Sequence, residues 1–275
     1  FADPIIQGGP LRETIDSLVL LGWLEEAEAL RFLRDECVFS RPLSLAGARS
    51  LWHTYRRRTE AAAASRLGAP AEPRPVTTTH AKRFLELARG CLNASAVVAV
   101  DPAKLLAFQF SLSTGRSAEH AAARATWAER CLLTERPRCA LPVTRTANSI
   151  FFDIPHAEHA LTLTPEGELR IEQFPAFSMI VPVGGGFMLR AGYHRAYAYL
   201  NARPTPQEPF LAAVTEGNLT ELRDPQLRAK LTSSHPPLVG DFLNANLAMP
   251  VKALKYRFRF KVSVELKRVP VGESD

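Results

Sequence analysis

A glycine followed by tyrosine, histidine and arginine is the part of the sequence best suited to chemistry. Gly192 comes after a short apolar run, and Tyr193, His194 and Arg195 begin a segment of helical composition. The first turn of a helix exposes unpaired N–H groups and a positive dipole end, which together bind phosphate. Glycine lets a ligand approach the backbone, histidine supplies a titratable imidazole, and arginine supplies a forked cation. The sequence therefore predicts a phosphate or nucleotide site at this turn, with Arg190 adding charge and His194 as the candidate catalytic residue.

The order of strand, glycine, His-Arg pair and helix resembles the signature of the ParB/sulfiredoxin-like superfamily. The resemblance covers about 177–214. It implies that the turn holds the phosphates of a nucleotide or contacts nucleic acid, with Gly192 as the turn glycine. His194 and Arg195 would contact phosphate, and Tyr193 would flank the pocket. The resemblance also implies a nucleotide-dependent phosphotransferase or a nuclease, with a nucleoside triphosphate and Mg²⁺ as its cofactor.

Two departures from the family narrow this expectation. Sulfiredoxins carry a cysteine where this chain has Tyr193, so sulfinic-acid reductase activity is not expected. Partition proteins carry a helix-turn-helix after the motif, whereas here Pro204, Pro206 and Pro209 follow. A structural interpretation of the turn also stays open. In it, glycine only makes the turn, His194 is a surface residue and the arginine is a structural cation.

A second constellation could bind a metal ion. Asp153, His156 and His159 occur at three-residue spacing, and these residue types bind zinc and other divalent metals. Pro155 lies inside the segment, and no partner ligand is evident. A polar loop is the alternative interpretation.

Two basic segments could contact a nucleic-acid backbone. The first precedes a proline-rich stretch and lies near aromatic residues, and the second lies in an alternating segment near the end of the chain. Basic clusters with aromatic neighbours can bind nucleic acid. The alternative is a solvated helix or strand face. The basic residues are Arg56, Arg57 and Arg58 in the first segment and Lys255, Arg257, Arg259 and Lys261 in the second.

The region 1–95 is predicted to be helical. Apolar residues recur at three- and four-residue spacings over 11–36, where Gly22 makes two shorter helices possible. A second helix is expected over 45–67, favoured by an alanine run at 61–64. Three prolines fall within 70–75, so 68–76 is predicted to be a linker or loop. Thr79 is expected to cap a short helix that ends at Gly90.

The region 96–275 is predicted to be the α+β, ParB-like part of the chain. Strands are expected at 97–100, 177–183, 187–190 and 210–214, with a hairpin over 160–173. Helices are expected from Ser117 to 133 and from Tyr193 to 200. Strict alternation from 254 to 266 predicts a long C-terminal strand or a bent pair of strands.

Composition and sequence pattern argue against a membrane-spanning or secreted protein. The 275 residues contain 46% hydrophobic side chains, enough for one large or two smaller domains, and no run long enough to span a membrane. No signal peptide is expected at the first residues, and the missing initiator Met indicates a trimmed start. The cysteines, expected to be reduced and mostly buried in a cytoplasmic protein, are Cys37, Cys91, Cys131 and Cys139.

A net charge of +6 favours anionic partners. The first hypothesis is a protein that binds a nucleotide or another phosphorylated ligand at the glycine turn. The second is a non-enzymatic factor that binds nucleic acid or protein through its basic surfaces. A protein partner docking on the N-terminal helices is also considered, and no membrane partner is expected.

Overall fold

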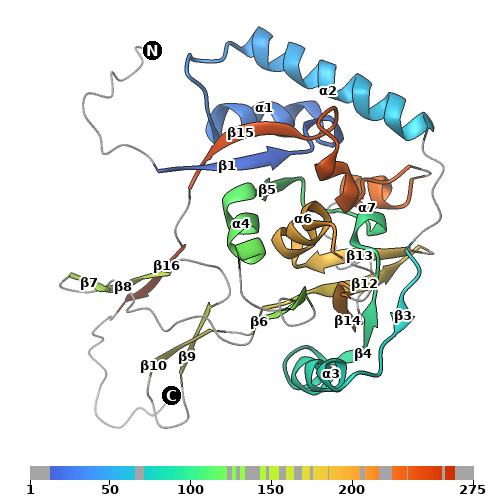
Figure 1. The fold of residues 1–275 in the computed structure, drawn as a ribbon. Coiled ribbons are helices and arrows are strands. Elements are labelled where there is room, and N and C mark those ends of the chain that lie inside the picture. Colours follow the sequence, from blue (N-terminus) through green and yellow to red (C-terminus); the bar gives the residue numbers. More distant parts are fainter. Residues whose placement is uncertain are drawn as a thin grey trace. The chain divides into compact units, whose positions relative to one another are not determined.

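The computed structural model describes most of the chain, and the described residues form helices and mixed sheets, an α+β structure (Figure 1). The chain divides into two compact units. Unit 1 comprises 1–133 and 177–255, and unit 2 comprises 134–176 and 256–275. The described residues are 13–65, 71–122, 126–127, 131–133, 143–146, 149–154, 159–163, 169–173, 176–184, 186–204, 208–216, 225–233, 235–255 and 258–263.

A five-stranded sheet forms one part of unit 1. Its spatial order is β13 (Gly186–Ala191), β12 (Met179–Val183), β14 (Leu211–Thr215), β4 (Ala94–Ala99) and β3 (Arg74–Pro75). All neighbours are antiparallel except β12 and β14, which run parallel. A parallel pair needs a crossover between its strands, and α6 (Tyr193–Ala202) lies in that crossover. The predicted strands over 177–183, 187–190 and 210–214 and the predicted helix from Tyr193 are therefore confirmed, with small shifts at their ends.

The largest apolar core of unit 1 lies against this sheet. The helix α3 (Thr79–Leu92) packs on β4 and β14. Phe84 of α3 is fully buried and stacks on Phe177, with ring centroids 5.6 Å apart. The N-cap of α3 is Thr78 rather than Thr79, because the Thr78 side chain accepts the N–H of Ala81. The boundary expected near residue 95 thus falls between two packed elements of unit 1.

A four-stranded sheet forms the other part of unit 1. Its order is β2 (Cys37–Val38), β15 (Met249–Leu254), β1 (Thr14–Val19) and β5 (Ser111–Ser113). The prediction of helix from residue 11 is wrong for its first part, where β1 pairs antiparallel with β15 over six residues. The apolar residues at 18–21 fit the spacing of a helix, but the buried end of a strand gives the same pattern.

Two helices and a short 3-10 helix accompany this sheet. The helices α1 (Glu26–Asp35) and α2 (Leu45–Ser65) pack against each other, and α2 also packs on η1 (Leu21–Trp23). The helix predicted over 45–67 is confirmed over 45–65, and 66–67 lie outside the described residues. Figure 1 shows α1 and α2 side by side on the same side of β1 and β15. No helix among the described residues is long and apolar enough to cross a membrane.

Unit 2 contains short antiparallel strands. The strand β8 (Ser149–Ile154) lies between β16 (Phe258–Ser263) and β7 (Val143–Thr146). The predicted hairpin over 160–173 is present as β9 (His159–Leu163) paired with β10 (Leu169–Gln173). The alternating residues from 254 onward do not form one strand, because β15 ends at Leu254 in unit 1 and β16 pairs in unit 2.

The remaining elements of the described chain are short. They are η2 (Pro102–Lys104), α4 (Thr114–Ala122), β6 (Leu132–Leu133), β11 (Ala176–Phe177), α7 (Pro225–Leu231) and η4 (Val239–Leu243). Of these elements, α4 lies beside α6.

Gly22 in η1 allows α2 to approach η1 closely. A Cβ at this position would collide with the Thr59 hydroxyl and with the carbonyl oxygen of Tyr55, both on α2. The backbone atom cannot move aside as the end of a flexible side chain could. Gly22→Ala is therefore expected to destabilise the protein by about 1–3 kcal/mol, the usual cost of overpacking. Chemical denaturation followed by circular dichroism measures this.

Gly90 provides the matched control. It lies within α3, and a Cβ there would meet nothing within 4 Å. Gly90→Ala is expected to leave stability unchanged or to raise it by up to about 1 kcal/mol, because alanine is the better helix former. Equal effects of the two substitutions would contradict the close packing of η1 on α2.

Candidate functional site

The turn that joins β13 to α6 requires glycine for two reasons. Gly192 has a φ of 101°, in the left-handed region that residues with a side chain rarely adopt. A Cβ there would also lie 2.8 Å from the Ser178 hydroxyl oxygen and 3.1 Å from the Ser178 Cα. Ser178 is fully buried, so the space beneath Gly192 is already filled by protein.

Tyr193 points into the core rather than into an open pocket. Its side chain is 3% exposed, and its hydroxyl oxygen accepts the N–H of Phe108 at 2.9 Å. The N–H of Gln109 lies 3.4 Å from the same oxygen, and the Phe108 ring meets the tyrosine ring edge-on. Burial raises the pKa of the Tyr193 hydroxyl well above its ordinary value. The residue therefore fixes the chain at 108–109, and the expectation that it flanks a ligand pocket does not fit this geometry.

Arg195 is buried as well. It is 5% exposed and donates from Nη1 to the Cys131 carbonyl oxygen at 3.2 Å and from Nη2 to the Phe177 carbonyl oxygen at 2.8 Å. Those carbonyls lie beside β6 and in β11, where the chain leaves unit 1 and returns to it. A guanidinium bound to two backbone carbonyls inside the core is a structural cation. This geometry favours the structural interpretation of Arg195 over a phosphate contact.

The cysteine beneath Arg195 is also part of the core. The Cys131 sulfur accepts the N–H of Leu211 at 3.3 Å, and burial raises the pKa of its thiol to about 11. Cys131 is therefore protonated at neutral pH, as expected for a buried, reduced cysteine. Cys37 is a free thiol that is only half-buried. The side chain of Cys91 and all of Cys139 lie outside the described residues.

His194 differs from its two neighbours because it reaches the start of another helix. It is half-buried, and its Nε2 accepts the N–H of Ser113 at 3.3 Å. Ser113 directly precedes α4, and its hydroxyl oxygen accepts the N–H of Arg116 at 3.3 Å. The first turns of α4 and α6 thus lie side by side. Each brings a positive dipole end to the same place.

A groove with a volume of about 510 Å³ lies between these two helices. Ligand pockets in proteins span roughly 300–1,000 Å³, and the volume of this groove lies within that range. Tyr197 and Asn201 share a face of α6 with His194, because residues three, four or seven positions apart lie on the same side of a helix. The lining residues are mostly small and are Thr114, Ser117, Ala118 and Ala121 from α4 and Tyr197, Ala198, Asn201 and Ala202 from α6.

The structure thus separates the residues predicted for the glycine turn. Gly192, Tyr193 and Arg195 hold the fold, His194 contacts the backbone just before α4, and Arg190 is exposed on β13. Sequence reasoning missed the contribution of α4, because the helix was expected to begin at Ser117. Ser113 acts as the N-cap of α4, because its hydroxyl oxygen accepts the N–H of Arg116 three residues on. Serine is a preferred N-cap residue, so its place before the helical segment could have indicated a start at Thr114.

The predicted basic surfaces are also separated. Arg56 pairs with Glu60 at 2.9 Å, Arg58 lies over the Tyr55 ring, and Arg57 is exposed. Near the C-terminus the four residues do not form one strand face. Lys255 pairs with Glu13 in unit 1, and Lys261 lies over the Phe151 ring in unit 2. Arg257 and the side chain of Arg259 lie outside the described residues.

The predicted metal ligands are described only in part. Asp153 lies in β8 and His159 in β9, but their side chains and the whole of His156 are outside the described residues. Within the part of the chain that the structure describes, no three His, Cys, Asp or Glu side chains are grouped to hold a metal ion. The metal site therefore stays a prediction.

Arg195→Ala is expected to lower the stability of the protein. The substitution leaves two buried carbonyls without their charged donor, which should cost about 3 kcal/mol. Thermal unfolding measures this, and Arg83→Ala on the exposed face of α3 is the matched control, expected to change stability by less than about 0.5 kcal/mol. Unchanged stability together with lost nucleotide binding would instead support the phosphate-contact interpretation of Arg195.

Comparisons with known proteins give no further identification. No protein-family model, no curated protein and no solved structure matches the chain. The resemblance of the glycine turn to the ParB/sulfiredoxin-like superfamily therefore stays a local one, and the function of the chain is inferred from its own contacts.

Proposed function

We propose that the groove between α4 and α6 binds a phosphorylated small molecule, with a nucleotide as the best-fitting class. The observation that carries this proposal is the hydrogen bond between Ser113 N–H and His194 Nε2, which brings the starts of α4 and α6 together. The described lining of the groove of about 510 Å³ begins at Thr114 on α4 and at Tyr197 on α6, one turn after His194. Helix starts attract anions through their dipoles and their unpaired N–H groups. Two such starts placed together suit a phosphate.

The start of α4 would supply most of the contacts to that phosphate. The N–H groups of Thr114 and Gly115 belong to its first turn, where no intrahelical acceptor exists. The hydroxyl groups of this turn are already engaged, since Thr114 donates to the Asp16 carbonyl at 3.0 Å and Ser117 donates to the Ser113 carbonyl at 3.0 Å. Backbone N–H groups of this turn would therefore bind the anion, and His194 would hold the turn in place because its Nε2 accepts the Ser113 N–H.

The rest of the groove suits the remainder of a nucleotide. Ala118, Ala121 and Ala198 leave space and present apolar walls, and Tyr197 offers an aromatic ring. Asn201 lies about 10 Å from His194 along the helix axis, at a rise of 1.5 Å per residue. Its amide both donates and accepts hydrogen bonds, the combination that can distinguish one heterocyclic base from another.

The arrangement around the turn supports the ParB-like assignment as part of this proposal. A hairpin of β12 and β13 leads through left-handed Gly192 into α6, and β14 then lies parallel to β12. The departure is Arg195, which faces inward. In this proposal Mg²⁺ enters bound to the phosphates of a nucleoside triphosphate, and a phosphotransferase or nuclease reaction would act on those phosphates.

A second candidate function uses the outward side of α2 to bind nucleic acid. Arg49, His53 and Arg57 are exposed at i, i+4 and i+8, so they form one line along the helix. The opposite side is fixed, because Tyr55 and Thr59 are buried. Glu26 and Glu60 pair with Arg49 and Arg56, which leaves a smaller net positive charge on this face.

The first function is tested with nucleoside mono-, di- and triphosphates, with and without Mg²⁺, in a thermal-shift assay. A ligand that binds only the folded protein stabilises it by about 2.7 kcal/mol at one hundred times its Kd. We expect a shift in the wild type and a loss of affinity of at least about tenfold in His194→Ala. Ala118→Trp, at an exposed position in the groove, should remove binding by filling it.

Matched controls lie on the exposed side of α2. His53→Ala and Ala61→Trp change the same residue types far from the groove and should leave the shift intact. A shift that survives both groove variants would place the ligand elsewhere. No shift with any nucleotide would overturn the nucleotide proposal and direct attention to α2.

The second function is tested by charge reversal at Arg57. Binding of labelled DNA or RNA to the wild type should weaken as salt rises, because phosphate contacts release counterions. Arg57→Glu should weaken binding and lower the slope of log affinity against log salt by about one for each lost contact. Arg83→Glu, on exposed α3, is the control. Equal effects of the two variants would show that the affinity reflects net charge rather than a surface on α2.

A further inference from the structure

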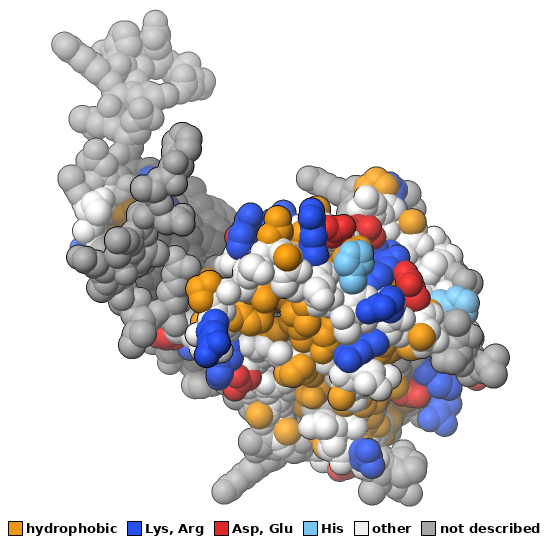
Figure 2. All heavy atoms as spheres, turned by 90° about the horizontal axis from the view of Figure 1, so that it is seen from above, with side chains coloured by type: hydrophobic (Ala, Val, Ile, Leu, Met, Phe, Trp, Pro, Cys, Tyr) orange, Lys and Arg blue, Asp and Glu red, His pale blue; other side chains and the backbone are white. Residues whose placement is uncertain are grey.

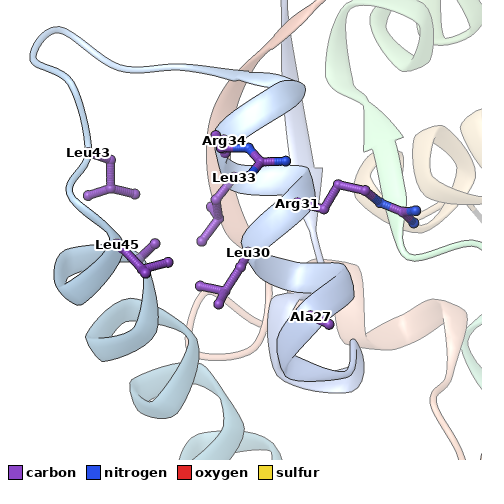
Figure 3. A pocket seen from close by; sticks show the side chains of 8 residues that line it. Ala27, Leu30, Arg31, Leu33, Arg34, Leu43 and Leu45 are labelled. Carbon is purple, nitrogen blue, oxygen red and sulfur yellow. The ribbon is translucent and has the colours of Figure 1, made fainter. Parts of the chain in front are cut away.

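An apolar groove lies between α1 and the start of α2, away from the site described above. Its volume is about 260 Å³, and its lining includes Leu30, Leu33, Leu43 and Leu45 together with Arg31 and Arg34. Figure 3 shows the four leucine side chains between the two helices, with Leu43 and Leu45 on the side of α2. Two helices that leave leucines between them offer the kind of surface on which a third helix packs.

Two exposed leucines line this groove. Leu45 is 61% exposed and Leu43 is 37% exposed. The described residues contain two other large apolar side chains that are exposed, Val38 on β2 and Leu243 in η4, and neither lines the groove. Exposed leucines in a groove favour burial by a partner, because apolar area removed from water gains about 25 cal/mol per Å².

Positive charge also borders the groove. The first turn of α2 contains no acidic residue, and Ser44 caps it by accepting the N–H of Gly47 at 3.1 Å. The positive dipole end of this long helix therefore lies beside Leu45. The described lining contains two arginines and no carboxylate, and Arg34 donates to Asp35 at 2.6 and 3.0 Å, so Arg31 supplies the charge that this ion pair does not neutralise. Figure 2, viewed from above relative to Figure 1, shows apolar side chains with both basic and acidic side chains around them.

We propose that this groove docks an acidic amphipathic helix of a partner protein. Leucine-type side chains at i, i+3 or i+4, and i+7 would occupy the space between α1 and α2. Carboxylates on the flanks of the same helix would meet the start of α2 and Arg31. Charge complementarity of this kind sets the choice of partner and its orientation. The binding surface is separate from the α4–α6 groove and does not depend on the function proposed there.

The test uses the full chain and a designed, fluorescein-labelled peptide of about 15 residues, roughly four helical turns. Leucines at helical spacing form one side of the peptide, and glutamates form the other sides. Fluorescence anisotropy should show saturable binding that weakens with salt. A second peptide, with lysine in place of every glutamate, should bind at least about tenfold more weakly, a difference of about 1.4 kcal/mol.

Leu45→Glu separates binding from folding. Leu45 is largely exposed, and a glutamate in the first turn of a helix interacts favourably with the dipole, so stability should be unchanged or slightly higher. The same variant should reduce peptide affinity at least about tenfold. Leu243→Glu, at the other exposed leucine, should reduce neither stability nor affinity. His194→Ala should leave peptide binding unchanged whatever it does to nucleotides.

Several results would overturn the proposal. They are no binding of the acidic peptide, equal binding of the lysine peptide, or equal effects of Leu45→Glu and Leu243→Glu. Analytical ultracentrifugation gives a further one. Self-association that Leu45→Glu abolishes would assign the groove to a second copy of this chain instead.

Discussion

Burial of the Arg195 guanidinium is the constraint on which the rest of unit 1 depends. A charge removed from water is tolerated only when protein groups replace the lost hydrogen bonds. The carbonyls of Cys131 and Phe177 do this, and they come from positions 64 and 18 residues earlier in the chain. Satisfying one guanidinium therefore fixes α6 against the two points where the chain leaves and re-enters unit 1.

The three residues after Gly192 anchor three different segments. Tyr193 holds the backbone at 108–109, His194 holds the start of α4, and Arg195 holds the segments around Cys131 and Phe177. Successive residues of a helix point about 100° apart, so neighbours in sequence must face different surroundings. Of the three side chains, only the imidazole is half-buried rather than buried. A motif that suits phosphate chemistry is thus used mainly to build the support for the adjoining groove.

The sequence predicted the local elements around this turn well. Apolar runs interrupted by glycines identified β12, β13, α6 and β14, and turn residues identified the hairpin of β9 and β10. The strand β1 was not predicted, because its partner lies more than two hundred positions away, as the Lys252–Asp16 pair shows with a separation of 236 residues. Local spacing carries no information on such a pairing.

The candidate site was predicted only in part for a related reason. Gly192 and His194 were placed correctly at the turn, but the inward direction of Tyr193 and Arg195 depends on carbonyls from distant segments. The contribution of α4 likewise depends on tertiary contact, since Ser113 and His194 are 81 residues apart. Sequence spacing named the residue types, and packing decided which of them could face a ligand.

The most direct measurement is a titration of isotopically labelled protein with ATP, followed by proton–nitrogen correlation NMR. The account predicts that the perturbed amides cluster at Thr114, Gly115, Arg116 and in the first turn of α6. The Arg195 side-chain N–H signals should stay protected from solvent exchange throughout. Perturbation confined to other elements, or an Arg195 side chain that exchanges freely and responds to the nucleotide, would contradict it.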